Sequence, residues 1–176
     1  MEPYHKQIQA TQLNEAADTP AKAVEGDLPT RVRTNSGQDA LKEVLAFLRA
    51  QQWLLLSLHW QVKGTDFYEL HLLFERLYGA LAGQIDSLAE KIVGYYGVEA
   101  VEMNDSLSRA QKWLKEWKGE PVDAALASEK QLQTLLRQTY EAMKEKKELS
   151  LGLDDYLMGL ASDHETHLYW LGQIKR

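Results

Sequence analysis

The chain has 176 residues, of which 44% are hydrophobic and 26% charged, with a net charge of −6 and no cysteine. These values are typical of one soluble globular domain, and they exclude disulfides and thiolate metal sites. No apolar run approaches the roughly 18 residues of a membrane helix, and the polar start "MEPYHKQIQATQLNE" carries no secretory signal, so we expect a cytoplasmic protein.

Residues 1–36 are predicted to form a flexible N-terminal tail. They hold three of the four prolines and few large apolar side chains. Four basic and five acidic side chains leave the tail with a net charge of −1, so it is not a basic arm. Because affinity for DNA comes from Lys and Arg, the charge of the tail and of the whole chain argues against DNA binding. The folded domain is expected to span 37–176.

A first helix is predicted over about 37–63. Asn35 or Ser36 can cap its start, and Gly64 suits the position just after its end. Its apolar side chains recur at helical spacing, which indicates one buried face. They are Leu41, Val44, Leu48, Leu55, Leu58 and Val62.

A second helix is predicted over about 67–95. Asp66 is expected to be its N-cap, with Glu69 completing a capping box. A short helix is expected inside the connection 97–120, where the sequence reads "DSLSRAQKWLKEW".

Two further helices are predicted, over about 121–147 and 153–173. Pro121 fits the first turn of the earlier one, and "LSLGLDD" separates the two. There is no strand-like alternation, so the predicted fold is all-α. Four long helices with one long link between the second and third match the crossover pattern of ferritin-like four-helix bundles.

The second helix has two distinct faces. One is an apolar stripe that we expect to face the core, formed by Leu70, Phe74, Leu77, Leu81, Ile85 and Leu88. Beside it, His71, Glu75, Asp86 and Glu90 share another sector. Imidazole with several carboxylates suits Fe(II), Zn(II) or Mn(II). The alternative is a solvated acidic face with one chance histidine.

The stretch "HWQVKGTDFYELH" places His59 and His71 on either side of the predicted turn at Gly64. Two histidines at one turn favour the metal site over the solvated face. Since the acidic sector points away from the core stripe of its own chain, the site should lie at a subunit contact or on an open exterior face. The helical pattern does not decide between these two.

At these residues the chain resembles the Dps family of small ferritin-like proteins. The resemblance is specific over about 58–96 and extends less specifically over about 37–176. The matching positions are His59, Trp60, Val62, Gly64, Phe67, His71, Phe74, Tyr78, Asp86, Ala89, Glu90, Lys91 and Ile92.

The resemblance implies a hollow dodecamer with ferroxidase sites between twofold-related subunits. Ligands corresponding to His59 and His71 would come from one subunit, and those corresponding to Asp86 and Glu90 from the other. The family usually has aspartate where Glu75 stands, so a shift of the second metal is expected there. Trp60 matches a tryptophan beside the site, and we expect core packing rather than a redox role for it.

The implied chemistry is that of an iron-oxidising and iron-storing mini-ferritin. Two Fe(II) per site would be oxidised by hydrogen peroxide or oxygen, and the ferric product would mineralise in the cavity, protecting against oxidative damage. The Glu-x-x-His signature of ferritin helices occurs only at Glu2 to His5, in the tail. This argues against a diiron site within one bundle.

The predicted fourth helix adds two histidines within its apolar seam, at His164 and His167. One interpretation is that both are core-edge residues with hydrogen-bonding partners. The other is that His164 is an additional ferroxidase ligand, and that a third imidazole strengthens binding of Zn(II) as a competing ion.

Three other functions stay open at this point. The chain could be a DNA-binding, nucleoid-compacting protein, a helical bundle with only a structural or protein-binding role, or a metalloregulatory or classical ferritin. The charge argues against the first, and an absorbance change on adding Fe(II) with peroxide would exclude the second.

Overall fold

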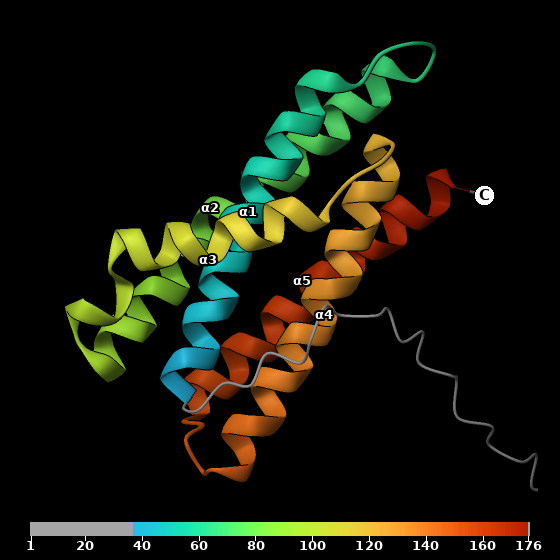
Figure 1. Cartoon of the computed structure of the whole chain (residues 1–176). Coiled ribbons are helices and arrows are strands. Elements are labelled where there is room, and N and C mark those ends of the chain that lie inside the picture. Colours follow the sequence, from blue (N-terminus) through green and yellow to red (C-terminus); the bar gives the residue numbers. More distant parts are fainter. Residues whose placement is uncertain (1–36, 176) are drawn as a thin grey trace, which may run out of the picture.

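The computed structural model describes residues 37–175, and within this range every regular element is helical (Figure 1). The elements are α1 (Gly37–Gln61), α2 (Phe67–Tyr96), the 3₁₀ turn η1 (Val98–Val101), α3 (Met103–Glu116), α4 (Pro121–Glu145) and α5 (Leu151–Ile174). The predicted tail and the proposed caps Asn35 and Ser36 lie outside the described residues. No helix in the described range is long and apolar enough to cross a membrane.

The four long helices form two antiparallel pairs. α1 packs against α2 and α4 against α5, while α1 also contacts α4. The connection through η1 and α3 carries the chain back along the bundle, so that α2 and α4 run in the same direction (Figure 1). The predicted all-α, ferritin-like bundle with a short helix in its long connection is confirmed.

The core lies where the apolar stripes of the helices meet. All six apolar positions predicted for α1 are buried, and so are Phe74, Leu77, Leu81 and Leu88 of α2. Leu70 and Ile85 are partly buried and pack against this core. Each fully buried large apolar side chain stabilises the fold by about 1.5–3 kcal/mol.

The short helix α3 is fixed across α1 by aromatic and charged contacts. Trp113 lies edge-on to Phe47 with ring centroids 4.7 Å apart, and its indole N–H donates to Glu43 at 2.7 Å. Arg109 binds Glu43 and Asp105 through pairs of 3.0 and 3.1 Å. Lys42, whose ammonium lies 2.6 Å from Asp105, and Arg109 together hold the pKa of the Asp105 carboxyl below its usual range.

The turn between α1 and α2 differs from its prediction in one respect. Gly64 has a φ of 89°, which confirms the glycine-favouring position expected after α1. Asp66 is the N-cap of α2, but its side chain makes no capping hydrogen bond, so the predicted capping box with Glu69 is wrong. The reason is conformational: Asp66 has φ −96° and ψ 18°, whereas a capping side chain requires extended backbone.

Candidate metal centres

His59 and His71 lie against each other across the turn between α1 and α2. Their rings stack with centroids 3.6 Å apart and planes 23° apart. The Nδ1–H of His59 donates to the backbone carbonyl of His71 at 2.8 Å, and that of His71 donates to the carbonyl of His59 at 2.9 Å. The His59 carbonyl is one of the last four of α1, which have no partner within the helix, and His71 satisfies it.

These reciprocal hydrogen bonds fix which nitrogen of each ring can bind a metal. A carbonyl oxygen only accepts, so Nδ1 must carry the hydrogen in both His59 and His71. In the neutral rings Nε2 then keeps its lone pair. Metal-binding histidines usually donate their other ring N–H to an oxygen in this way, which fixes tautomer and orientation. Both imidazoles therefore have a fixed orientation with Nε2 as the nitrogen available to a ligand.

Several exposed side chains near this histidine pair are apolar. Exposed large hydrophobic side chains cluster on the two helix ends that carry it, namely Trp60, Phe67, Tyr68 and Leu72. Trp60 is 69% exposed, so its predicted packing in the core is wrong for the single chain. It follows His59, which faces inward, and one residue along a helix turns a side chain by about 100°. Clustered exposed apolar side chains of this kind mark contact surfaces.

The predicted carboxylates are all exposed but do not lie together. Glu75 is one helical turn after His71 and lies on the same face of α2. Asp86 and Glu90 are a turn apart from each other, but Asp86 is 15 residues beyond His71. At a rise of about 1.5 Å per residue, this separation is roughly 22 Å along α2. Within one chain, Asp86 and Glu90 are therefore too far from His71 to bind the same metal ion.

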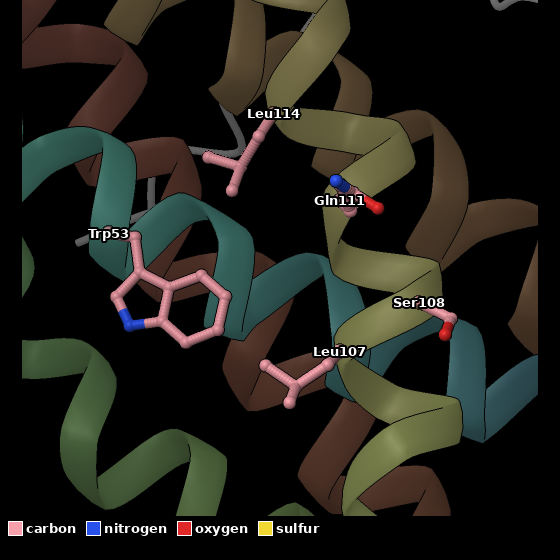
Figure 2. Close-up of a pocket in the computed structure, with 5 residues that line it drawn as sticks. All are labelled: Trp53, Leu107, Ser108, Gln111 and Leu114. Carbon is pink, nitrogen blue, oxygen red and sulfur yellow. The ribbon is translucent and has the colours of Figure 1, made fainter.

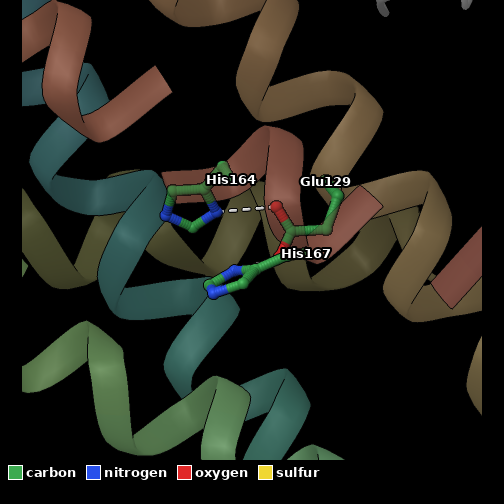
Figure 3. A group of neighbouring side chains, drawn as sticks. All are labelled: Glu129, His164 and His167. Atoms are coloured by element: carbon green, nitrogen blue, oxygen red, sulfur yellow. Dashed lines mark hydrogen bonds and ion pairs between the residues drawn. The ribbon is translucent and has the colours of Figure 1, made fainter. Parts of the chain in front are cut away.

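A second histidine pair lies inside the bundle, with its rings edge to face and one carboxylate beside both of them (Figure 3). Glu129 of α4 and His164 and His167 of α5 are buried, and their ligand atoms all lie within 4.8 Å of one another. Glu129 Oε2 is 2.6 Å from His164 Nδ1, and Oε1 is 3.3 Å from His167 Nδ1. Burial opposes ionisation of Glu129, but these contacts hold the pKa of its carboxyl below the usual range.

His164 is thus a predicted metal ligand with neighbours other than those expected. It is fully enclosed between α2, α4 and α5, where its Nε2 lies 3.1 Å from Gln84 Oε1. Asp86 is two residues beyond Gln84, which places it on nearly the opposite side of α2. The structure therefore groups His164 with Glu129 and His167, and not with the exposed carboxylates of its own chain.

Glu129 did not figure among the predicted site residues. The signal available in the sequence is its register, because Ala125, Glu129, Leu132 and Leu136 follow steps of four and three on the buried face of α4. An acid within such an apolar stripe requires a partner, since an unpaired buried carboxylate is very costly.

A hollow of about 370 Å³ lies between α1 and α3 (Figure 2). Trp53 of α1 faces α3 there, and Leu107, Ser108, Gln111 and Leu114 complete the lining. Because none of these side chains is titratable or a strong metal ligand, the hollow is not a candidate catalytic site.

Comparison with known families identifies the fold. A family model described as a ferritin-like domain matches residues 38–176. The chain belongs to the ferritin-like family. Two solved Dps structures have the same fold. The one from Thermosynechococcus elongatus has a TM-score of 0.70 and 24% sequence identity, and the match covers 80% of this chain and 90% of that one. The one from Vibrio cholerae has a TM-score of 0.68 and 22% sequence identity, and the match covers 80% of this chain and 89% of that one.

Curated relatives share shorter segments. General stress protein 20U of Bacillus subtilis is 45% identical over 56 residues, which are 32% of this chain and 39% of the relative. A DNA protection during starvation protein of Brevibacillus brevis is 32% identical over 97 residues, which are 51% of this chain and 64% of the relative. The chain thus spans less than two thirds of the length of either relative. The predicted resemblance to the Dps family is confirmed.

Proposed function

We propose that the protein is an iron-storing mini-ferritin that oxidises Fe(II) at a site shared by two copies of the chain. His59 and His71, with Glu75 beside them, supply one half of the site. Asp86 and Glu90 of a second copy supply the other half. The proposal is supported by membership of the ferritin-like family and by the description of the Vibrio cholerae relative as a member of a broad superfamily of ferritin-like diiron-carboxylate proteins.

The observation that carries the proposal is the separation of two half-sites along α2. The histidine pair, which joins the end of α1 to the start of α2, is oriented by its own hydrogen bonds, and exposed apolar side chains lie close to it in the chain. The exposed acids Asp86 and Glu90 lie roughly 22 and 28 Å beyond His71 along α2. In a twofold contact between antiparallel copies of α2, each histidine pair meets the acids of the partner, because such an interface repeats every contact twice.

The chemistry of this donor set suits Fe(II) as a substrate. Two imidazoles and three carboxylates offer enough ligands for two ions, and carboxylates stabilise the higher charge of Fe(III). Each of two Fe(II) ions loses one electron, and hydrogen peroxide takes up both electrons with two protons to give two molecules of water. Paired one-electron donors thus reduce peroxide without releasing hydroxyl radical. Oxygen is the alternative oxidant.

A complementation experiment tests whether the site is shared. His71→Ala and Asp86→Ala are each expected to lower the rate of Fe(II) oxidation more than about 100-fold, since even changes behind the ligands cost 10–100-fold. Particles co-assembled from equal amounts of both variants should regain about a quarter of the wild-type rate. Random pairing makes half of the dimers mixed, and each mixed dimer keeps one intact site of two.

A site formed within one chain predicts no recovery, because every chain in the mixture carries a defect. A mixed particle as inactive as its parents would therefore contradict the shared site. Wild-type activity in both parent variants would contradict the whole proposal. The rate is followed by the ferric absorbance after adding Fe(II) and peroxide, and particle mass should correspond to a dodecamer.

Two further parts of the proposal concern other ligands. Zn(II) is expected to compete with Fe(II), because imidazole and carboxylate bind both ions and zinc binds more tightly. DNA is not an expected partner, because the net charge of −6 repels phosphates. A tight complex with DNA in a gel-shift assay at low salt would contradict this second expectation.

A further inference from the structure

The buried group Glu129, His164 and His167 uses none of the residues proposed to oxidise iron. Its members come from α4 and α5, and their rings and carboxylate converge in the interior of the bundle (Figure 3). His164 and His167 are three residues apart on α5, which places both imidazoles on one helix face toward Glu129. Side-chain exposure is 0% for His164 and Glu129 and 7% for His167.

The outer contacts of the group define the nitrogen that faces its centre. Gln84 directs its amide nitrogen to Asp163 at 3.5 Å, so its Oε1 is the atom that meets His164 Nε2. An amide oxygen only accepts, so the hydrogen is on Nε2. His164 therefore has the outer hydrogen bond that is usual for a metal ligand, and its Nδ1 points at the carboxylate.

Stability alone does not account for this group. Taking a carboxylate and imidazoles out of water costs several kcal/mol per ion, and apolar residues of similar volume often do as well or better in such positions. Nearby, Gln51 donates to Ser128, the residue before Glu129, yet its own buried Oε1 has no hydrogen-bond partner within the described chain. The interior here holds more polar groups than the chain itself satisfies.

An entry route from solvent reaches the group. A groove of about 290 Å³ between α2 and α5 is lined by Arg76, Gln84, Asp163, His167 and Trp170, among others. His167 forms part of its wall, so one ring connects the buried carboxylate with the surface. Asp163 and Arg76 place one negative and one positive side chain along this groove.

We propose that Glu129, His164 and His167 form a second metal site, contained within one chain, that binds a divalent transition ion and prefers Zn(II). Two imidazoles and one carboxylate are a ligand set of both zinc and Fe(II) sites, and zinc binds N/O ligands more tightly than Fe(II) does. The cation takes the place of the proton between His164 Nδ1 and Glu129. Three protein ligands leave a fourth position for water.

The test uses the assembled full-length protein in a background that lacks the proposed oxidation site. His71→Ala and Asp86→Ala together remove ligands of that site, so binding to the buried group is measured whether or not the proposed function is correct. After treatment with a chelator, Zn(II) is titrated against a competing chelator, and Co(II) is added as a spectroscopic probe. Glu129→Gln and His167→Gln are the test variants. Glu165→Gln, on the exposed face of α5, is the matched control.

The background protein is expected to bind one Zn(II) per chain and to give a visible absorption band with Co(II). Glu129→Gln and His167→Gln should each weaken Zn(II) binding by at least about 100-fold, and the control should not change it. Unchanged Zn(II) affinity in a test variant that assembles, or no Zn(II) bound by the background, overturns the proposal. Should Glu129→Gln not assemble, His167→Gln decides, because its side chain borders the groove.

Anomalous diffraction from Zn(II)-soaked crystals of the background protein gives an independent result. A zinc peak between the three side chains supports the site, and zinc peaks found only elsewhere overturn it.

Discussion

The two histidine pairs of this protein are prepared in opposite ways. His59 and His71 are oriented by backbone carbonyls, and the carboxylates they would need lie elsewhere on the same chain. His164 and His167 are oriented by a carboxylate, Glu129, that contacts both rings. His59 is buried and His71 is partly exposed near exposed apolar side chains, whereas His164 and His167 are both buried. Under the two proposals, the first pair is completed by assembly, and the second has all its protein ligands within one folded chain.

Because of this difference, the two pairs are expected to contribute differently to folding stability and to activity. The hydrogen bonds of His59 and His71 to backbone carbonyls join neutral groups, and each such bond adds only about 0.5–1.5 kcal/mol to folding because it replaces bonds to water. A buried carboxylate with imidazole partners has a large effect on folding when one partner is lost, because the remaining charge stays buried. Substitutions should therefore affect activity at the first pair and stability at the second.

The largest effect on stability is expected for Glu129→Ala. Loss of this carboxylate leaves two buried imidazoles without their hydrogen-bond partner, and should destabilise the fold by about 1–3 kcal/mol for each unsatisfied group, with a further cost for the cavity. Unfolding by urea, with chelator present, measures the change. Glu165→Ala, on the exposed face of α5, should change stability by less than about 0.5 kcal/mol. Equal stability of Glu129→Ala and wild type would remove the contrast between the pairs.

His71→Ala is expected to cost much less stability while it abolishes iron oxidation. Only the hydrogen bond donated by its own ring is lost, because the backbone carbonyl of residue 71 still accepts from His59, and a typical hydrogen bond contributes about 0.5–1.5 kcal/mol. The same urea experiment measures this change. A loss as large as that of Glu129→Ala would show that the surface pair is as important for folding as the buried one.

Asp105, with its ion-pair partners Lys42 and Arg109, provides a comparison for stability at a position away from both histidine pairs. Lys42 and Arg109 lower the pKa of Asp105 in the folded protein, so its stabilising effect is present above the unfolded pKa of about 3.9 and is lost as pH falls through the lower folded value. Asp105→Asn should cost less than about 1 kcal/mol at pH 7, since solvent screens this partly exposed group. The free energies of unfolding of the variant and the wild type, measured with urea, should become equal in acid. A difference between them that stays constant down to pH 2 would contradict this assignment.

The smallest effect is expected for Glu75→Asp, which shortens one carboxylate of the surface site by a single methylene. The two histidines and the partner's acids are unchanged, so the rate of Fe(II) oxidation should change by less than about tenfold. Stopped-flow absorbance measures it. A loss as large as that of Asp86→Ala would show that the position of this carboxylate is as critical as the presence of the others.

Much of the fold follows directly from the sequence. The apolar spacing of α1 and α2 gives their buried faces because each residue on a helix faces a fixed direction, and Gly64 marks the turn because its φ is positive. The stacking of His59 on His71 requires the turn geometry, which spacing alone does not contain. The exposure of Trp60 likewise depends on the angle at which α1 ends.

The sequence indicated two of the three members of the buried group but not the third. His164 and His167 stand out as polar residues in an apolar seam. Glu129 is 35 residues before His164, and only the packing of α4 on α5 brings them together. A helical pattern gives the direction in which a side chain points but not which neighbour it meets, so the pairing of two faces has to come from the structure.

The reciprocal hydrogen bonds between His59 and His71 use the backbone of each residue to orient the ring of the other. A substitution at either position leaves the backbone carbonyl in place, so the remaining ring keeps its acceptor and loses only the ring stacked on it. Each single variant is therefore expected to retain one oriented imidazole. The orientation of either ligand thus depends on the path of the chain through the turn and not on the identity of the other side chain.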